Sequence, residues 1–163
     1  MGLMSNLLDK ELIVLQSNAQ HYSDVFKELG QTMIDKGYAN ANYIEGLLER
    51  EANFPTGIQV ETAGIALPHT DASFVKKSKI GLLVLENPVQ FGMMGGDGEK
   101  VQVNIVFLLG CSEGNQHLLA LQKVIELIQD ADFVEKILSL ESKNEAYELL
   151  SSNLTIQLEE EVK

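Results

Sequence analysis

Two apolar runs in the middle of the chain limit most strongly the folds that it can adopt. Residues 80–85 and 101–109 are rich in aliphatic and β-branched side chains. Such runs are typical of central strands covered on both faces, because a strand with one face in water alternates apolar and polar residues. Three shorter segments, residues 12–15, 58–60 and 64–67, are further strand candidates. The sequence therefore predicts a sheet with a layer packed on each side.

Apolar residues at helical spacing precede the long strands. We expect Ser23 to cap a first helix and Gly37 to end it, since serine favours the N-cap position and glycine the position after a helix. A second helix is predicted over residues 42–52, with three residues facing inward: Tyr43, Leu47 and Leu48. Residues 54–57 are then expected to form a turn.

The last third of the chain is predicted to be helical. Two more amphipathic helices are expected over residues 133–140 and 143–150. Before them, Ser112 or Asn115 is expected to cap a helix whose apolar face contains Leu118, Leu121, Val124, Ile125 and Ile128. Helices at both ends with strands between them indicate a layered α/β sandwich with a mixed sheet.

The remaining segments complete the prediction of a single domain. Residues 89–91 alternate and are interpreted as an edge strand, and the glycine-rich residues 92–100 as a mobile loop. A chain of 163 residues is long enough for one domain with a substantial core. We therefore expect one domain over residues 1–163, with its core over about 8–152 and the acidic run 159–161 in a solvated tail.

Charge and composition exclude several classes of function. The 24 Asp and Glu residues against 12 Lys and Arg give a net charge of -12, which repels a nucleic-acid backbone and attracts a basic protein partner. The single cysteine, Cys111, excludes an intrachain disulfide and fits a reducing compartment. Residues 1–9 do not resemble a secretory signal, and no apolar run approaches the roughly 20 residues of a membrane span. We expect a cytoplasmic protein without direct membrane insertion.

The segment Gly-Ile-Ala-Leu-Pro-His-Thr-Asp at residues 64–71 carries the first candidate for chemistry. Pro68 has no backbone N–H and ends a buried strand, so His69 is expected at the strand end, where side chains leave the core. An imidazole can accept and release a proton or a phosphoryl group near neutral pH. The alternative is a turn histidine without a chemical role.

His117 and Arg50 are the other candidates. His117 lies in the first turn of the helix predicted after residues 101–109, where backbone N–H groups and the helix dipole favour an anion and lower an imidazole pKa. Arg50, near the end of the second predicted helix, can hold phosphoryl oxygens through two parallel hydrogen bonds. The structural alternatives are a histidine that caps its own helix and a surface arginine that pairs with Glu49 or Glu51.

The other reactive side chains do not indicate a cofactor site. His21 is expected at the surface before a helix, and Cys111 is expected to pack as a small hydrophobic residue. The histidines at positions 21, 69 and 117 lack the spacing of zinc ligands. The phosphate-binding loop of nucleotide-binding proteins is also absent from the sequence. Neither a metal nor a cofactor is therefore expected.

Taken together, these residues give the chain a resemblance to a known family. Three segments resemble the EIIA domain of the fructose–mannitol class in the bacterial phosphoenolpyruvate:sugar phosphotransferase system: Leu-Glu-Arg-Glu at 48–51, Gly-Ile-Ala-Leu-Pro-His at 64–69 and Gln-His-Leu-Leu-Ala-Leu at 116–121. Their order and spacing match, and the likeness covers roughly residues 8–152. The Pro-His segment is the most specific, although Leu67 stands where the family usually has a β-branched residue. The resemblance implies an α/β sandwich with a mixed sheet.

The resemblance also implies a role for each candidate. His69 matches the histidine that is transiently phosphorylated, on the ring nitrogen farther from the backbone (a tele-phosphohistidine). His117 matches a second histidine that would donate to a phosphoryl oxygen, and Arg50 the arginine that would offset developing charge. The donor would be the phosphocarrier HPr and the acceptor a cysteine of EIIB, with the membrane component EIIC involved indirectly. The sequence does not show which group fixes the tautomer of His69.

Within the family, residues 68–71 and 87–95 most resemble galactitol-type EIIA proteins. The chain would then be a phosphotransferase subunit that relays phosphate for galactitol or a related sugar or polyol. Two alternatives remain open. One is a regulatory EIIA-like protein of the nitrogen-related or transcription-regulator type, and the other is a non-catalytic acidic binding module in which the histidines are structural.

Overall fold

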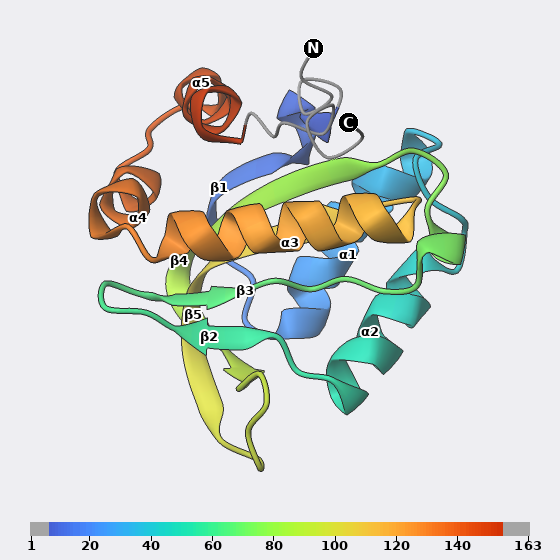
Figure 1. Ribbon diagram of the computed structural model, residues 1–163, viewed down its shortest axis with the longest axis horizontal. Helices are drawn as coiled ribbons and strands as arrows, with labels where there is room; N and C mark the ends of the chain where they lie inside the picture. Colours follow the sequence, from blue (N-terminus) through green and yellow to red (C-terminus); the bar gives the residue numbers. More distant parts are fainter. Residues whose placement is uncertain (1–6, 155–163) are drawn as a thin grey trace.

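A mixed five-stranded sheet lies between two layers of helices (Figure 1). The computed structural model describes residues 7–154. The strands lie in the order β1-β4-β5-β3-β2, where β1 pairs in parallel with β4 and β3 with β5, while the β4–β5 and β2–β3 pairs are antiparallel. The predicted layered α/β sandwich with a mixed sheet is confirmed. The strands are β1 Ile13–Ser17, β2 Gly57–Gln59, β3 Gly64–Ala66, β4 Lys79–Gly92 and β5 Lys100–Gly110.

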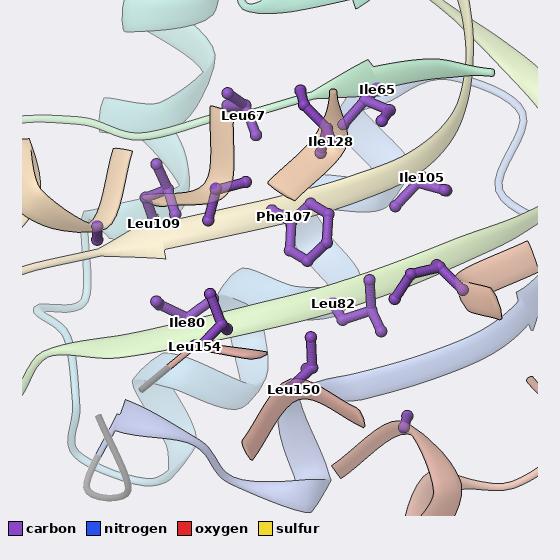
Figure 2. Close-up of a cluster of buried hydrophobic side chains, with 14 of the residues drawn as sticks. Ile65, Leu67, Ile80, Leu82, Ile105, Phe107, Leu109, Ile128, Leu150 and Leu154 are labelled. Atoms are coloured by element: carbon purple, nitrogen blue, oxygen red, sulfur yellow. The ribbon is translucent and has the colours of Figure 1, made fainter. Parts of the chain in front are cut away.

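The two long strands lie inside the sheet, as predicted. Along β5, Ile105, Phe107 and Leu109 face one helical layer, whereas Val106 and Leu108 face the other. Figure 2 shows the first three packed among side chains from neighbouring strands and helices. Burial of each such side chain stabilises the fold by about 1.5–3 kcal/mol relative to exposure. The side chains of these strands therefore pack against the helical layers on both faces of the sheet.

Residues 89–91 form a strand, as predicted, but they are not a separate one. These residues continue β4 and pair with β5 beyond a register shift between Val84 and Val89. Pro88 lies inside that shift, where β4 is not paired with β5 and a missing N–H costs no ladder hydrogen bond. The proline therefore interrupts the pairing of a long strand without ending it.

The glycine-rich segment interpreted as a loop over residues 92–100 forms the turn of the β4–β5 hairpin. Gly92 and Lys100 themselves belong to the strands. Gly95 and Gly98 have φ angles of 71° and 102°, which lie in the left-handed region that glycine tolerates without steric cost. The glycines thus serve a tight chain reversal.

Helices α1 (Tyr22–Asp35) and α2 (Tyr43–Asn53) cover one face of the sheet. The N-cap of α1 is His21, and the predicted cap Ser23 lies inside the helix. The His21 Nδ1 atom accepts a hydrogen bond from the Ser23 backbone N–H at 3.1 Å, because an imidazole nitrogen can serve as the acceptor that a serine oxygen would otherwise supply. Gly37 follows the helix with a φ of 77°, as expected for a terminating glycine.

Helices α3 (Gly114–Ile128), α4 (Ala131–Leu138) and α5 (Lys143–Asn153) form the second layer. Figure 1 shows α3 lying across the sheet, with α4 and α5 beyond its C-terminal end. The fully buried positions of α3 form a stripe along one side of the helix: Ala120, Val124 and Ile128. The small side chain at the first of these positions does not stand out in a hydrophobic pattern, although it marks the face that contacts the core.

The beginning of α3 differs from the prediction. Glu113 occupies the N-cap and makes no side-chain capping hydrogen bond, so neither Ser112 nor Asn115 is the cap. The Ser112 hydroxyl instead lies 3.1 Å from that of Ser78. Leu118, predicted to face inward, is 53% exposed. Leu118 lies outside the buried stripe of α3, and it directly follows the candidate site residue His117 in the chain.

The packed core extends from Leu7 to Leu154. Within residues 7–154, no helix is both long enough and apolar enough to cross a membrane. The acidic run predicted as a tail, residues 159–161, lies outside the described residues.

Candidate functional site

A pocket of about 290 Å³ lies where β3 and β5 end. Because these two strands are parallel, their carboxyl ends meet at the same edge of the sheet. The Leu109 N–H donates to the Pro68 carbonyl at 3.1 Å and extends this pairing beyond β3. Segments distant in sequence line the pocket: Arg50, His69, Thr70, Asp71, Ala72, Cys111, Gly114 and His117. The three side chains selected from the sequence therefore meet in one place.

A close approach between strands positions the segment that carries His69. A Cβ atom on Gly64 would lie 2.0 Å from the Gln102 carbonyl oxygen, so only glycine fits at the start of β3. The following residues pair with β5 and are fully buried. The Leu67 side chain is also fully buried, and Figure 2 shows it among the core side chains. His69 thus follows a strand that is fixed on both sides.

His69 is held by the backbone two residues before it. Its Nδ1 atom lies 2.9 Å from the Leu67 carbonyl oxygen. Because a carbonyl oxygen only accepts hydrogen bonds, Nδ1 carries the hydrogen and Nε2 keeps a lone pair. Burial lowers the pKa of His69, and the charge of Arg50 lowers it further, while the hydrogen bond to Leu67 opposes them. The ring is therefore neutral at pH 7, and the Leu67 carbonyl is the group that fixes its tautomer.

His117 lies in the first turn of α3, as predicted. Its ring centroid is 4.4 Å from that of His69, with the two ring planes inclined by 47°. Burial lowers the pKa of His117 to about 4, and the charges of His69 and Arg50 contribute to the shift. Within residues 7–154 the His117 ring has no hydrogen-bond partner. Its N–H group is therefore available to a group that enters the pocket.

A polar network fixes the segment from which α3 begins. The Ser78 hydroxyl accepts a hydrogen bond from the Ser112 backbone N–H at 2.8 Å. It also donates to the Gln116 side-chain carbonyl at 2.7 Å. Gln116 immediately precedes His117, so this network joins the beginning of α3 to the residue before β4. The backbone of His117 is thereby positioned from outside its own helix.

Arg50 lies in the last turn of α2. Its guanidinium carbon is 4.3 Å from the centroid of the Phe54 ring, which is 58% exposed. The surface-pairing alternative is not observed, since Arg50 forms no ion pair with any described residue and the carboxylate of Glu51 is bound by Thr56. The arginine charge therefore acts on the pocket, where it lowers the pKa values of both histidines.

Sequence reasoning placed Cys111 in the interior and did not place it at the site. Its side chain is buried, as predicted, and burial raises the pKa of the thiol to about 11, so it stays protonated. Asp71, another lining residue, accepts a hydrogen bond from the Ser73 N–H and caps the short helix η3 (Ala72–Phe74). Cys111 follows one long strand as His69 follows β3. The parallel pairing that brings them together is not visible in the sequence.

The rest of the described structure offers no competing reactive centre. His21 is exposed and stacks on Tyr22 at 4.4 Å, far along the chain from the pocket residues. No group of three or more histidine, cysteine or carboxylate side chains suited to a metal ion occurs within residues 7–154. A larger hollow of about 500 Å³ lies beside α4 and α5, but its lining contains no histidine, cysteine or arginine. The pocket with two neutral imidazoles and a guanidinium is the one suited to binding and transferring an anionic group.

Comparisons with known proteins find relatives of similar sequence and similar fold. The family model described as "Phosphoenolpyruvate-dependent sugar phosphotransferase system, EIIA 2" matches residues 6–153. The galactitol-specific EIIA component of Escherichia coli strain K12 is 36% identical over 118 residues, which cover 72% of this chain and 78% of that protein. The structure of nitrogen regulatory protein IIA-Ntr from Neisseria meningitidis has a TM-score of 0.74 at 25% identity and covers 91% of this chain and 99% of its own. A chain from the Escherichia coli complex of enzyme IIAMTL with phosphorylated enzyme IIBMTL is similar in fold. Its TM-score is 0.72 at 22% identity, and the match covers 90% of this chain and 99% of that one.

Proposed function

The chain belongs to the EIIA 2 family of the phosphoenolpyruvate-dependent sugar phosphotransferase system, and on this premise we propose that His69 accepts a phosphoryl group from phospho-HPr and passes it to a cysteine of EIIB. Family membership makes the chain a phosphotransferase component with a phosphoryl-relay role for a sugar or polyol. The observation that carries the assignment of His69 is the 2.9 Å contact between its Nδ1 atom and the Leu67 carbonyl. This contact leaves Nε2 as the nucleophile.

The proposed relay consists of two in-line displacements. In the first, the Nε2 lone pair of His69 attacks the phosphorus of the phosphohistidine on HPr. A new P–N bond forms, the old P–N bond breaks, and its electron pair returns to the imidazole of HPr. In the second, a cysteine thiolate of EIIB attacks the same phosphorus, and the electron pair of the P–N bond returns to Nε2. A phosphorylated histidine is already an activated donor, so the proposal includes no cofactor and no metal.

His117 and Arg50 stabilise the transferred group in this scheme. The neutral His117 ring donates an N–H to a phosphoryl oxygen, and the Arg50 guanidinium offsets the negative charge on the equatorial oxygens. Preorganised donors of this kind are worth about 3–4 kcal/mol of transition-state stabilisation. The lowered pKa values of both histidines keep their rings neutral at physiological pH. His69 is thus able to act as a nucleophile without first losing a proton.

Two exposed apolar side chains adjoin these residues in the chain. Phe54 packs against Arg50 and is 58% exposed, and Leu118 follows His117 and is 53% exposed. Most large apolar side chains of the described residues are buried. We assign Phe54 and Leu118 to an apolar rim that contacts HPr and EIIB. Each partner, when bound, would cover the rim and exclude water from the phosphoryl group. The acidic balance of the chain would attract a basic carrier surface.

The similarity to a galactitol-specific component supports galactitol or a related polyol as the transported substrate. The chain would operate in the cytoplasm and reach the membrane component EIIC only through EIIB. A regulatory role is the second candidate, because one structural neighbour with a TM-score of 0.74 is a nitrogen regulatory protein. Restoration of galactitol phosphorylation in a system that lacks its EIIA supports transport. Failure with every EIIB tested, together with binding to a regulator that depends on phosphorylation, would favour regulation.

The decisive experiment is phosphoryl uptake. The chain is incubated with phosphoenolpyruvate, enzyme I and HPr, and its intact mass is measured. We expect one acid-labile phosphate per wild-type chain and none in His69→Ala. The control is His21→Asn, which changes a histidine away from the pocket and keeps an N-cap acceptor for α1. Stoichiometric uptake by His69→Ala would overturn the assignment of the nucleophile, and an unphosphorylated wild-type chain would overturn the relay itself.

A further inference from the structure

A buried carboxyl group lies next to the site and has no part in the chemistry proposed above. Among the described residues, few polar or charged side chains are buried, and they include Ser17, Glu51 and Thr56. Glu51 is 4% exposed and Thr56 is 1% exposed, and these two residues bind each other. Burying a carboxyl group is costly unless it is well hydrogen-bonded. The position of Glu51, directly after Arg50 in the chain, therefore requires an explanation.

Both carboxyl oxygens of Glu51 are bound to the same residue. The Thr56 backbone N–H donates to Oε2 at 2.8 Å. The Thr56 hydroxyl lies 2.9 Å from Oε1 and 3.1 Å from Oε2. Glu51 belongs to the last turn of α2, and Thr56 precedes β2. The carboxyl group thus joins the end of α2 to the residue before β2 and fixes the turn between them.

Thr56 in turn binds the segment that precedes His69. Its carbonyl oxygen accepts a hydrogen bond from the Leu67 N–H at 3.3 Å. The Leu67 carbonyl then accepts from His69 Nδ1 at 2.9 Å. Because β3 ends at Ala66 and Pro68 has no N–H, Thr56 supplies the backbone hydrogen bond on this side of the segment. A long bond of 3.3 Å is sensitive to displacement of its acceptor.

We propose that Glu51 is a positioning residue for His69, which acts through Thr56 and the backbone of Leu67 to hold the imidazole in the tautomer with a free Nε2. The inference rests on the proposed function of His69 as nucleophile. Through Thr56, the same carboxyl group also links the last turn of α2, which contains Arg50, to the segment after β3 that contains His69. Glu51 therefore helps to set the separation between the nucleophile and the cation that faces it, without touching the phosphoryl group.

The test uses Glu51→Ala and Glu51→Gln. In Glu51→Gln the side-chain carbonyl can still accept from the Thr56 N–H, and the amide can donate to the Thr56 hydroxyl. We expect this variant to retain the wild-type tautomer and a phosphorylation rate within twofold of wild type. In Glu51→Ala we expect the rate to fall about tenfold, as for other outer partners that orient functional imidazoles.

Nitrogen-15 NMR of the ring provides a readout that a merely structural role would not move. In the wild-type chain, we expect Nδ1 of His69 at the chemical shift of a protonated nitrogen and Nε2 at that of an unprotonated one. In Glu51→Ala the difference between these shifts should decrease as the second tautomer becomes populated. The signals are assigned by their loss in His69→Gln. This measurement requires no phosphoryl donor, so it tests Glu51 even where the proposed relay fails.

Ser17→Ala is the matched control. It removes another hydroxyl–carboxylate hydrogen bond, which the buried Ser17 hydroxyl of β1 donates to the exposed Glu28 at 2.8 Å at the opposite edge of the sheet. We expect it to lower stability without changing the tautomer or the rate. If Glu51→Ala behaves like Ser17→Ala, Glu51 is only a structural brace and the proposal is wrong. If Glu51→Ala does not fold, Thr56→Val is compared with Thr56→Ser, and an unchanged tautomer and rate in the valine variant overturn the proposal.

Discussion

The two histidines of the pocket are held in different ways. His69 follows a buried strand, and its ring donates to the Leu67 carbonyl at 2.9 Å. His117 lies in the first turn of α3, and its ring has no hydrogen-bond partner within residues 7–154, although its backbone is fixed by the network around Ser78. One ring is therefore fixed by a hydrogen bond of its own, whereas the other is positioned only through its main chain.

This difference corresponds to two chemical tasks. A nucleophile must present one nitrogen with a lone pair, so a fixed tautomer favours reaction at Nε2 of His69. A stabilising group must donate to an oxygen that is present only while the phosphoryl group occupies the pocket, so a free N–H on His117 has no earlier partner to give up. The pocket thus combines a ring with a fixed tautomer and a ring that forms its hydrogen bond during transfer.

The largest expected effect separates the two roles directly. Since His117 only stabilises the transferred group, His117→Ala should still take up one phosphate per chain. The rate of uptake should fall about 100- to 1,000-fold, as for removal of a preorganised donor from other active sites. Rapid-quench measurement of phosphorylation by phospho-HPr checks both quantities. An unchanged rate would remove the role of His117, and a loss of stoichiometry with the fold intact would make the two histidines equivalent.

The next effect concerns the buried support behind His69 and depends on pH. Burial raises the pKa of Glu51 from 4.5 to about 7, against the opposing hydrogen bonds from Thr56. The folded state therefore binds the proton more tightly, and this contribution to stability is complete below pH 4.5 and lost as the pH rises through 7. Glu51→Gln cannot titrate. Its free energy of unfolding relative to wild type should rise by about 2–3 kcal/mol between pH 5 and pH 9.

Urea unfolding at a series of pH values measures this difference. Contributions from groups that titrate equally in both proteins cancel when the two free energies of unfolding are subtracted. His117 is one such group, because it is present in both proteins. Its lowered pKa makes stability fall as the pH drops below 6.5, which is opposite to the effect of Glu51. A constant difference between Glu51→Gln and wild type would show that Glu51 has an ordinary pKa. The buried carboxyl group would then differ little from one at the surface.

The smallest effect concerns the support behind His117. Ser78→Ala removes the acceptor of the Ser112 N–H and the donor to Gln116. A loss of about 1–2 kcal/mol of stability is expected from the unpaired, partly buried groups. The transfer rate should fall less than in His117→Ala, and the tautomer of His69 should not change. Thermal unfolding and ring NMR check these outcomes, with Ser152→Ala at an exposed position of α5 as control. A changed His69 tautomer would mean that the Ser78 network also positions His69 and is not separate from the contacts of Glu51 and Thr56.

Local patterns were sufficient for much of the fold. The apolar runs at 80–85 and 101–109 predicted two interior strands, and Gly37 predicted the end of α1. Errors arose where several residue types can perform one task or where tertiary packing chose between faces. An imidazole capped α1 in place of a serine. On α3, Val124 and Ile128 are buried as predicted, but the stripe continues through Ala120 and leaves Leu118 exposed. Pro88 interrupted the pairing of a long strand and made its last part look like a separate one.

Local sequence patterns predict most of the helices and strands and the side chains that lie at their ends. Pro68 places His69 after a strand, and the helical patterns place Arg50 and His117 near helix ends. The shared pocket of the three side chains and the contact of His69 with the Leu67 carbonyl arise from tertiary packing. It also buried Glu51 against Thr56. The reason is physical: propensity and periodicity depend on near neighbours in the chain, whereas these contacts depend on the parallel register of β3 with β5 and on helix packing across the sheet.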